Sequence, residues 1–195
     1  MLDVLTKESD ARLVGDHWLF WIGLVIFTTG QGMTGLSLEF GASQHPIDYM
    51  HWMMLLGSLM MMPYAVKMPR TLVNRIASPL LILGVAAIGG MAMIDFILWS
   101  YGLTPERNAL IDHLSAEPAI WPVFMELGPG WVFGFGLCLP SLYYRRQAPL
   151  GTLLVVLGGI MLPFGLRHYV LLGYPVIIVG YAICFWRSDR RDAGT

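Results

Sequence analysis

Six long apolar segments divide this chain, and nearly all of its lysines and arginines lie on one side of them. The segments cover residues 17–36, 50–66, 78–101, 120–143, 150–166 and 169–186. A helix needs about 20 apolar residues to cross the roughly 30 Å hydrocarbon core of a bilayer. A spanning helix also satisfies its own backbone hydrogen bonds, which lipid cannot do. The pattern therefore predicts an all-α fold, a polytopic integral membrane helical bundle with six transmembrane helices.

The basic residues predict the orientation of this bundle. If each segment crosses the membrane once, only Arg107 and Arg167 lie on one face, and ten basic residues share the other: Lys7, Arg12, Lys67, Arg70, Arg75, Arg145, Arg146, Arg187, Arg190 and Arg191. Short loops rich in lysine and arginine remain in the cytoplasm. We therefore expect a protein of the inner or plasma membrane with both termini cytoplasmic, including a short segment 1–16 and a tail 187–195.

Composition agrees with a single membrane domain. Hydrophobic residues make up 56% of the chain and charged residues 13%, against roughly 25% charged residues in soluble domains. No linker divides residues 1–195 into two domains. A net charge of −1 argues against a nucleic-acid partner. The expected partners are the lipid bilayer and either other membrane subunits or further copies of this chain.

Two carboxylic acids fall inside the apolar segments. Asp95 and Glu126 each lie about six residues from the non-cytoplasmic end of their segment. An ionised side chain in mid-bilayer costs about 2.5–3.5 kcal/mol on insertion scales. We therefore predict that both side chains face the interior of the bundle. The Gly128-Pro129-Gly130 sequence is expected to interrupt the fourth helix and to free backbone carbonyls there.

Most of the histidines gather at the same non-cytoplasmic face. Imidazole and carboxylate groups together suit zinc or copper, and a thioether from Met50 or Met54 would favour copper(I). His17 lies at the opposite face and is expected to take no part. Cys138 and Cys184 are too few and too widely spaced for a thiolate site. The candidate metal ligands are Glu39, His45, Asp48, His51, Asp95, His113, Glu126 and His168.

The same face offers a second cofactor hypothesis. His51 and His168 each open a helix, so the two imidazoles can bind a haem b from both sides. This is less favoured than a metal ion, because haem ligands usually lie deeper in a bundle. Trp52, Trp131 and Arg167 are the residues expected to line a cofactor pocket.

Three functions remain open from the sequence. The first is a metal- or haem-binding redox subunit of a larger membrane complex, which the clustering of histidines favours. The second is a small proton- or ion-coupled transporter or channel that uses Asp95 and Glu126. The third is a non-catalytic accessory subunit. The chain has no phosphate-binding loop, nucleophile elbow or dinucleotide fingerprint, so an enzyme acting on soluble substrates is not favoured.

Overall fold

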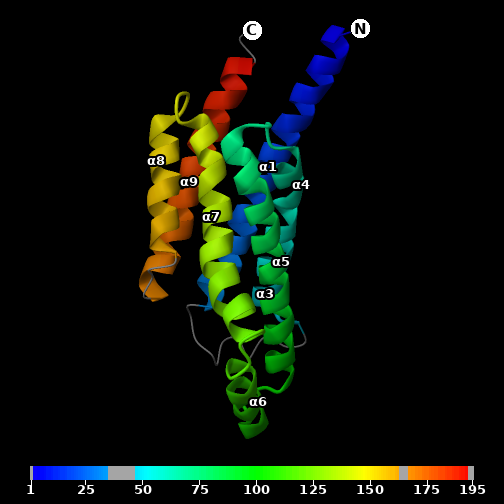
Figure 1. Cartoon of the computed structure of the whole chain (residues 1–195), viewed down its shortest axis with the longest axis vertical. Coiled ribbons are helices and arrows are strands. Elements are labelled where there is room, and N and C mark those ends of the chain that lie inside the picture. The colour runs from blue at the N-terminus through cyan, green and yellow to red at the C-terminus, as the bar shows by residue number, and fades with distance from the viewer. Residues whose placement is uncertain (1, 35–46, 163–166, 193–195) are drawn as a thin grey trace.

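The protein is an elongated bundle of helices that run up and down along one axis (Figure 1). The computed structural model describes residues 2–34, 47–162 and 167–192, and within them the side chains of 16–34, 47–162 and 172–190. Every regular element in these ranges is a helix. The prediction of an all-α fold is therefore confirmed for the part of the chain that is described.

The helices follow the predicted segments with shifted boundaries. The second segment forms two helices, and the fourth forms three joined end to end, of which η1 is a π-helix and η2 a 3-10 helix. A short helix, α6, lies beyond the third segment. The elements are α1 (Leu2–Thr34), α3 (Tyr49–Met60), α4 (Met62–Lys67), α5 (Leu72–Ser100), α6 (Pro105–Ser115), η1 (Pro122–Val132), α7 (Phe133–Cys138), η2 (Leu139–Tyr144), α8 (Pro149–Met161) and α9 (Arg167–Asp192).

Pro63 accounts for the division of the second segment. Proline has no backbone N–H, so a regular helix cannot continue through it without losing a hydrogen bond. The chain turns at Met61, whose N–H bonds to the Ser58 carbonyl 3.1 Å away, and α4 then begins with Pro63 in its first turn. The helix therefore breaks between α3 and α4, next to Pro63.

The expected interruption at Gly128-Pro129-Gly130 is wrong. The chain stays helical from Pro122 to Tyr144, and Pro129 lies inside η1. A π-helix bonds each N–H five residues back, which widens the turn. This bonding continues to the end of the element, where the Phe133 N–H donates to the Gly128 carbonyl.

Small residues bring the helices into close contact. A Cβ atom added to Gly57 of α3 would lie 2.5 Å from the Gly23 carbonyl oxygen of α1. The two backbones therefore touch, as is common between helices in membranes. Around these contacts lies a core of fully buried large side chains, which include Phe20, Phe27, Phe133, Tyr144 and Tyr181.

Among the described residues, two helical stretches are long and apolar enough to cross a membrane. They are Leu72–Ser100, with a mean hydropathy of 2.3, and Pro122–Tyr144, with 1.3. The six-span arrangement is not established by the described residues. Helices α3, with 12 residues, and α8, with 13, fall short of the roughly 20 that a span needs.

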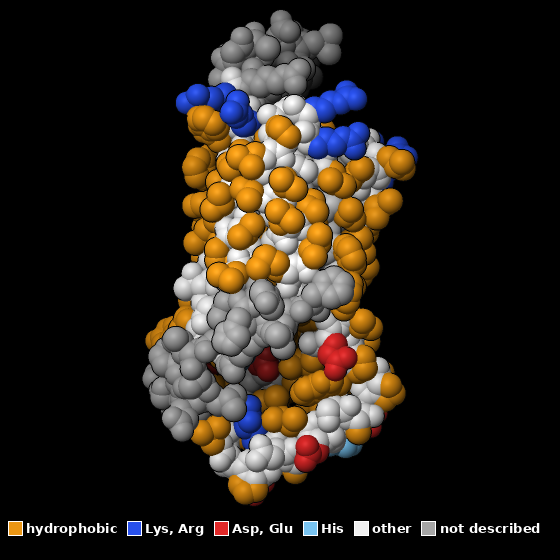
Figure 2. All heavy atoms as spheres, turned by 90° about the vertical axis from the view of Figure 1, so that its left-hand side faces the viewer, with side chains coloured by type: hydrophobic (Ala, Val, Ile, Leu, Met, Phe, Trp, Pro, Cys, Tyr) orange, Lys and Arg blue, Asp and Glu red, His pale blue; other side chains and the backbone are white. Residues whose placement is uncertain are grey.

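Charge divides the molecule into two ends. Figure 2 shows apolar side chains over the middle of one face, lysines and arginines gathered at one end, and acidic side chains toward the other. We call the end with the lysines and arginines the basic end. It contains Lys67, Arg70, Arg75, Arg145, Arg146, Arg187 and Arg190, at the ends of α4, α5, η2 and α9. The opposite end, which carries α6, is called the α6 end.

Candidate functional site

The α6 end contains a carboxylate–imidazole–carboxylate cluster. Its first part forms where α3 begins. Asp48 is the N-cap of α3, and its Oδ1 accepts the backbone N–H of His51 at 3.2 Å. Its Oδ2 lies 2.5 Å from Nδ1 of the same histidine. Because Asp48 is buried and held by both bonds, it fixes the orientation of the imidazole ring.

A second helix supplies the other carboxylate. Asp95, near the Ser100 end of α5, has its Oδ2 atom 3.3 Å from Nε2 of His51. The ring of Phe96 packs edge-on against the imidazole, with centroids 6.1 Å apart. The side chains are 1% exposed for Asp48, 13% for His51 and 19% for Asp95. The imidazole is therefore held between two carboxylates that are mostly removed from solvent.

The geometry of this cluster can accommodate a cation. When Nδ1 of His51 donates to an ionised Asp48, a neutral ring presents the lone pair of Nε2 to Asp95. A lone pair facing a carboxylate oxygen at 3.3 Å is repulsive unless a positive charge lies between them. That charge is a proton, on the ring or on the Asp95 carboxyl, or a metal ion. The arrangement therefore has room for one cation between His51 and Asp95.

The predicted thioether ligands do not belong to this cluster. Met54 is 2% exposed and packs against Gly30 of α1. Met50 is also buried, and its backbone carbonyl lies against the same glycine. The Met54 side chain serves the α1–α3 contact, which weakens the argument for copper(I).

The other predicted ligands do not join the cluster among the described residues. His113, on α6, and Glu126, on η1, are both exposed. The prediction that Glu126 faces the interior is therefore wrong. The prediction rested only on the cost of an ionised side chain in lipid, and that cost does not determine which face of η1 the residue occupies. The side chains of the remaining candidates lie outside the described residues: Glu39, His45, Arg167 and His168.

Within the described ranges, no group of three or more histidine, cysteine, aspartate or glutamate side chains is arranged to hold a metal ion. The metal and haem hypotheses both need imidazoles beyond His51, and His45 and His168 are not described. Both hypotheses stay predictions.

The predicted cofactor residues are dispersed. Trp52 is 45% exposed and packs against Phe96, 5.3 Å between ring centroids, beside the cluster. Trp131 is 37% exposed and lines an apolar pocket of about 250 Å³ between the fourth segment and α8. These two tryptophans therefore do not share a pocket.

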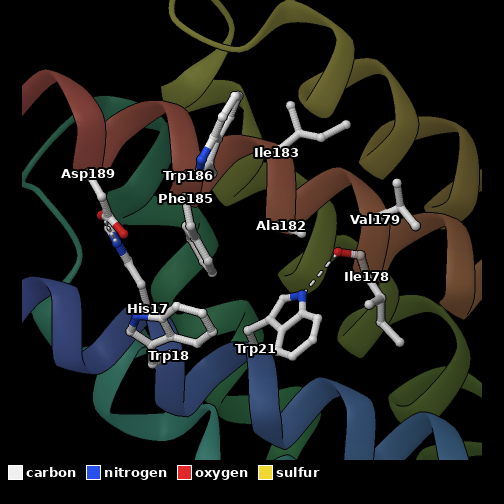
Figure 3. A pocket seen from close by; sticks show the side chains of 10 residues that line it. All are labelled: His17, Trp18, Trp21, Ile178, Val179, Ala182, Ile183, Phe185, Trp186 and Asp189. Carbon is white, nitrogen blue, oxygen red and sulfur yellow. Dashed lines mark hydrogen bonds and ion pairs between the residues drawn. The ribbon is translucent and has the colours of Figure 1, made fainter.

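Sequence reasoning missed a second polar cluster, at the basic end. His17 is 3% exposed, and its Nδ1 lies 3.3 Å from Asp189 Oδ1, as Figure 3 shows. Its Nε2 lies 3.0 Å from the Tyr144 hydroxyl, which in turn lies 3.2 Å from the Tyr64 hydroxyl. Phe185 stacks on the imidazole with centroids 4.2 Å apart. Side chains from α1, α4, η2 and α9 thus form one buried network.

A signal for this network exists in the sequence. His17, Tyr64, Tyr144 and Asp189 each lie at or near the basic end of a different apolar segment. Counting depth from that end, as was done for Asp95 and Glu126, would have put all four in one layer.

No family model, no curated protein and no solved structure matches this chain.

Proposed function

We propose that the protein is a six-helix membrane protein that binds a proton reversibly at Asp48, His51 and Asp95, and that it acts as a small proton-coupled transporter or channel. The observation that carries the proposal is the single imidazole held between two carboxylates on different helices. Such a cluster changes its charge when one proton enters or leaves, and the packing of α3 against α5 responds to that charge.

The membrane part of the proposal rests on exposed apolar surface. Only 39% of the apolar window in Leu72–Ser100 and 28% of that in Pro122–Tyr144 is buried. The core helix of a water-soluble protein would bury most of its apolar residues, and large exposed apolar surfaces mark contact with lipid or protein. The rule that basic loops remain cytoplasmic then assigns the basic end to the cytoplasm.

Proton flux into proteoliposomes tests the proposal. A pH gradient is imposed across vesicles that contain a trapped pH-sensitive dye. We expect Asp95→Asn and His51→Ala to abolish the protein-dependent flux. The matched control is Glu126→Gln, which removes an exposed carboxylate of the neighbouring fourth segment and should leave the flux unchanged. Equal flux from the wild type and Asp95→Asn would reject the proposal.

A metal site is the second candidate, favoured by one distance. Bonds from zinc to nitrogen or oxygen are about 2.0–2.2 Å long, so two ligands of one ion lie within roughly 4 Å of each other. Nε2 of His51 and Oδ2 of Asp95, at 3.3 Å, meet this condition. A carboxylate on the other ring nitrogen, as Asp48 provides, is the usual support for a metal-bound histidine. With the Met54 side chain in the α1–α3 contact, zinc is favoured over copper.

Elemental and optical analysis of the purified protein separates the two candidates. Bound zinc that falls in a His51→Ala, His168→Ala double variant would support the metal site, and a haem spectrum lost in that variant would support haem. Metal at wild-type stoichiometry in the double variant would reject the metal and haem hypotheses. A protein with neither flux nor cofactor would be an accessory subunit.

A further inference from the structure

A pocket of about 490 Å³ lies between α1 and α9 near the basic end (Figure 3). This volume falls in the range of roughly 300–1,000 Å³ that is usual for small-molecule sites. Apolar side chains form its walls: Trp18, Trp21, Ile178, Val179, Ala182 and Ile183. The polar side chains of His17 and Asp189 lie together at one end of it.

The pocket opens on the side of the bundle. Trp18 is 58% exposed, Val179 51% and Trp186 49%, and all three line the pocket. In the membrane arrangement proposed above, this side faces the hydrocarbon chains of the lipid leaflet next to the basic end. An occupant therefore enters from the lipid and must itself be largely apolar.

Two arginines contact Trp186, one of the residues that line the pocket. The guanidinium carbon of Arg190 is 4.1 Å from the centroid of the Trp186 ring, and that of Arg187 is 5.5 Å away. These distances are typical of cation–π contacts, so Trp186 holds two positive charges near the pocket. The negative charge of Asp189 is directed at His17, at 3.3 Å. The two guanidinium groups on Trp186 thus offer an anion a site next to the pocket.

We propose that this pocket binds an anionic phospholipid, with an acyl chain between Trp18 and Ile183 and the phosphate beside Arg187 and Arg190. A lipid matches both halves of the site, because it joins a long apolar chain to a negative group. The proposal rests on the membrane arrangement proposed above, and it is independent of the cluster at Asp48, His51 and Asp95.

Lipid binding to the protein in detergent, measured by native mass spectrometry, tests the proposal. Phosphatidylglycerol and phosphatidylcholine of equal chain length are the probes, and we expect the protein to prefer phosphatidylglycerol. Each basic side chain near a membrane surface contributes about 1 kcal/mol to the binding of anionic lipid. An Arg187→Gln, Arg190→Gln double variant should therefore lose roughly thirtyfold in affinity for phosphatidylglycerol. The matched control is Arg145→Gln, Arg146→Gln, which removes two exposed arginines of the same end outside the pocket.

A second pair of variants tests the acyl-chain part of the site. Ala182→Trp fills the pocket and should reduce the binding of both lipids, whereas Ala86→Trp, at an exposed position of α5, should not. Equal binding of the two lipids by the wild type, or equal losses in the two arginine variants, would overturn the proposal. The proposal would also be overturned if a second copy of the chain, and not lipid, occupied the pocket. Flotation with vesicles tests the membrane arrangement separately: a protein that does not float contradicts that arrangement itself.

If Ala182→Trp does not fold, quenching decides the same point. Phosphatidylglycerol with brominated acyl chains should quench the fluorescence of Trp18 and Trp21 in the wild-type protein. The quenching should fall in a Trp18→Phe, Trp21→Phe variant by more than in a Trp52→Phe, Trp131→Phe variant. Equal losses in the two variants would contradict the site.

Discussion

Asp48 combines two tasks that different substitutions can separate. Its carboxylate caps α3 through the backbone N–H of His51 and also fixes the imidazole ring through Nδ1. An asparagine side chain caps a helix about as well as aspartate does, whereas alanine does not. The cap therefore stabilises α3, whereas the negative charge is the part that the proposed proton binding needs.

We expect Asp48→Ala to lower the free energy of unfolding by about 1 kcal/mol or more, since it removes the cap. Asp48→Asn should stay close to the wild type in stability and still lose proton flux, because its side chain is neutral. Thermal unfolding in detergent, followed by circular dichroism, measures the first effect. If both variants unfold at the same temperature, Asp48 does not act as a cap.

One argument, the cost of a charged side chain in lipid, gave two residue-level predictions with different outcomes. Asp95 was expected to face the interior, and its side chain is 19% exposed and lies 3.3 Å from His51. Glu126 was expected to do the same, and it is exposed on η1, because this cost does not determine which face of a helix a residue occupies. The network around His17 was missed because tyrosine hydroxyls were not counted as polar groups inside the apolar segments.

At the scale of the elements, the contact between α1 and α3 depends on the absence of side chains. A Cβ atom on Gly57 would lie 2.5 Å from both the Gly23 carbonyl oxygen and the backbone nitrogen of Phe27. Neither of these is the flexible end of a side chain. The two helices would have to separate to admit even a methyl group.

Gly57→Ala should therefore lower the free energy of unfolding by about 1–3 kcal/mol, the usual cost of overpacking. The matched control is Gly32→Ala in α1, where an added Cβ meets no heavy atom within 4 Å. That change should be neutral or stabilising by up to about 1 kcal/mol, since alanine favours a helix over glycine. Thermal unfolding of both variants measures the difference. A Gly57→Ala protein as stable as the wild type would show that the helices are not in contact there.

The stability of helix α6 should depend on pH. Its first turn contains Glu106, and hydrogen bonds from the residue's own backbone N–H and from the Thr104 side chain lower the pKa of this carboxyl. A pKa lowered by folding stabilises the helix above the unfolded pKa, near 4.5. This contribution is lost as the pH falls through the folded pKa. Amide hydrogen exchange at Arg107 and Asn108, corrected for intrinsic rates, should therefore accelerate in acid. In Glu106→Gln the acceleration should be smaller, and an equal acceleration would contradict the role of this carboxyl.

Element boundaries could be predicted only where the sequence carries a local signal. Thr71 caps α5, because its side chain accepts the Asn74 N–H at 3.2 Å. The apolar segment itself begins later, so the predicted start at residue 78 came about two turns too late. Pro63 is such a signal, because it removes a backbone donor where α3 gives way to α4. The break predicted at Pro129 is absent, because the π-helix η1 accommodates this proline. Whether the chain adopts a π-helix there depends on its packing against α5.

At the scale of the whole molecule, the bundle has one basic end and one end that carries α6. If it spans a membrane as proposed, the two ends lie in different compartments. Asn108 on α6 and Arg146 at the basic end are both exposed, so a reagent that cannot cross lipid can distinguish them.

We expect a cysteine at position 108 to react with an impermeant maleimide in intact cells, and one at position 146 to react only after permeabilisation. The protein without an added cysteine is the control, because Cys184 is buried and Cys138 is half-buried. Reaction at both positions in intact cells would contradict the proposed topology. Reaction in the reverse order would invert it.

The contact between α1 and α9 joins the first helix of the chain to the last. Trp21 of α1 donates to the Ile178 carbonyl of α9 at 3.2 Å, and His17 lies 3.3 Å from Asp189. Helix α1 begins at Leu2 and α9 ends at Asp192, and both residues lie at the same end of the molecule (Figure 1). The first and last helices are therefore neighbours, and their free ends lie at the same end of the molecule. A linker could join the present termini, and new termini could open between Arg146 and Gln147. Those termini would again lie at the basic end, so a circular permutant would keep every helix on its present side.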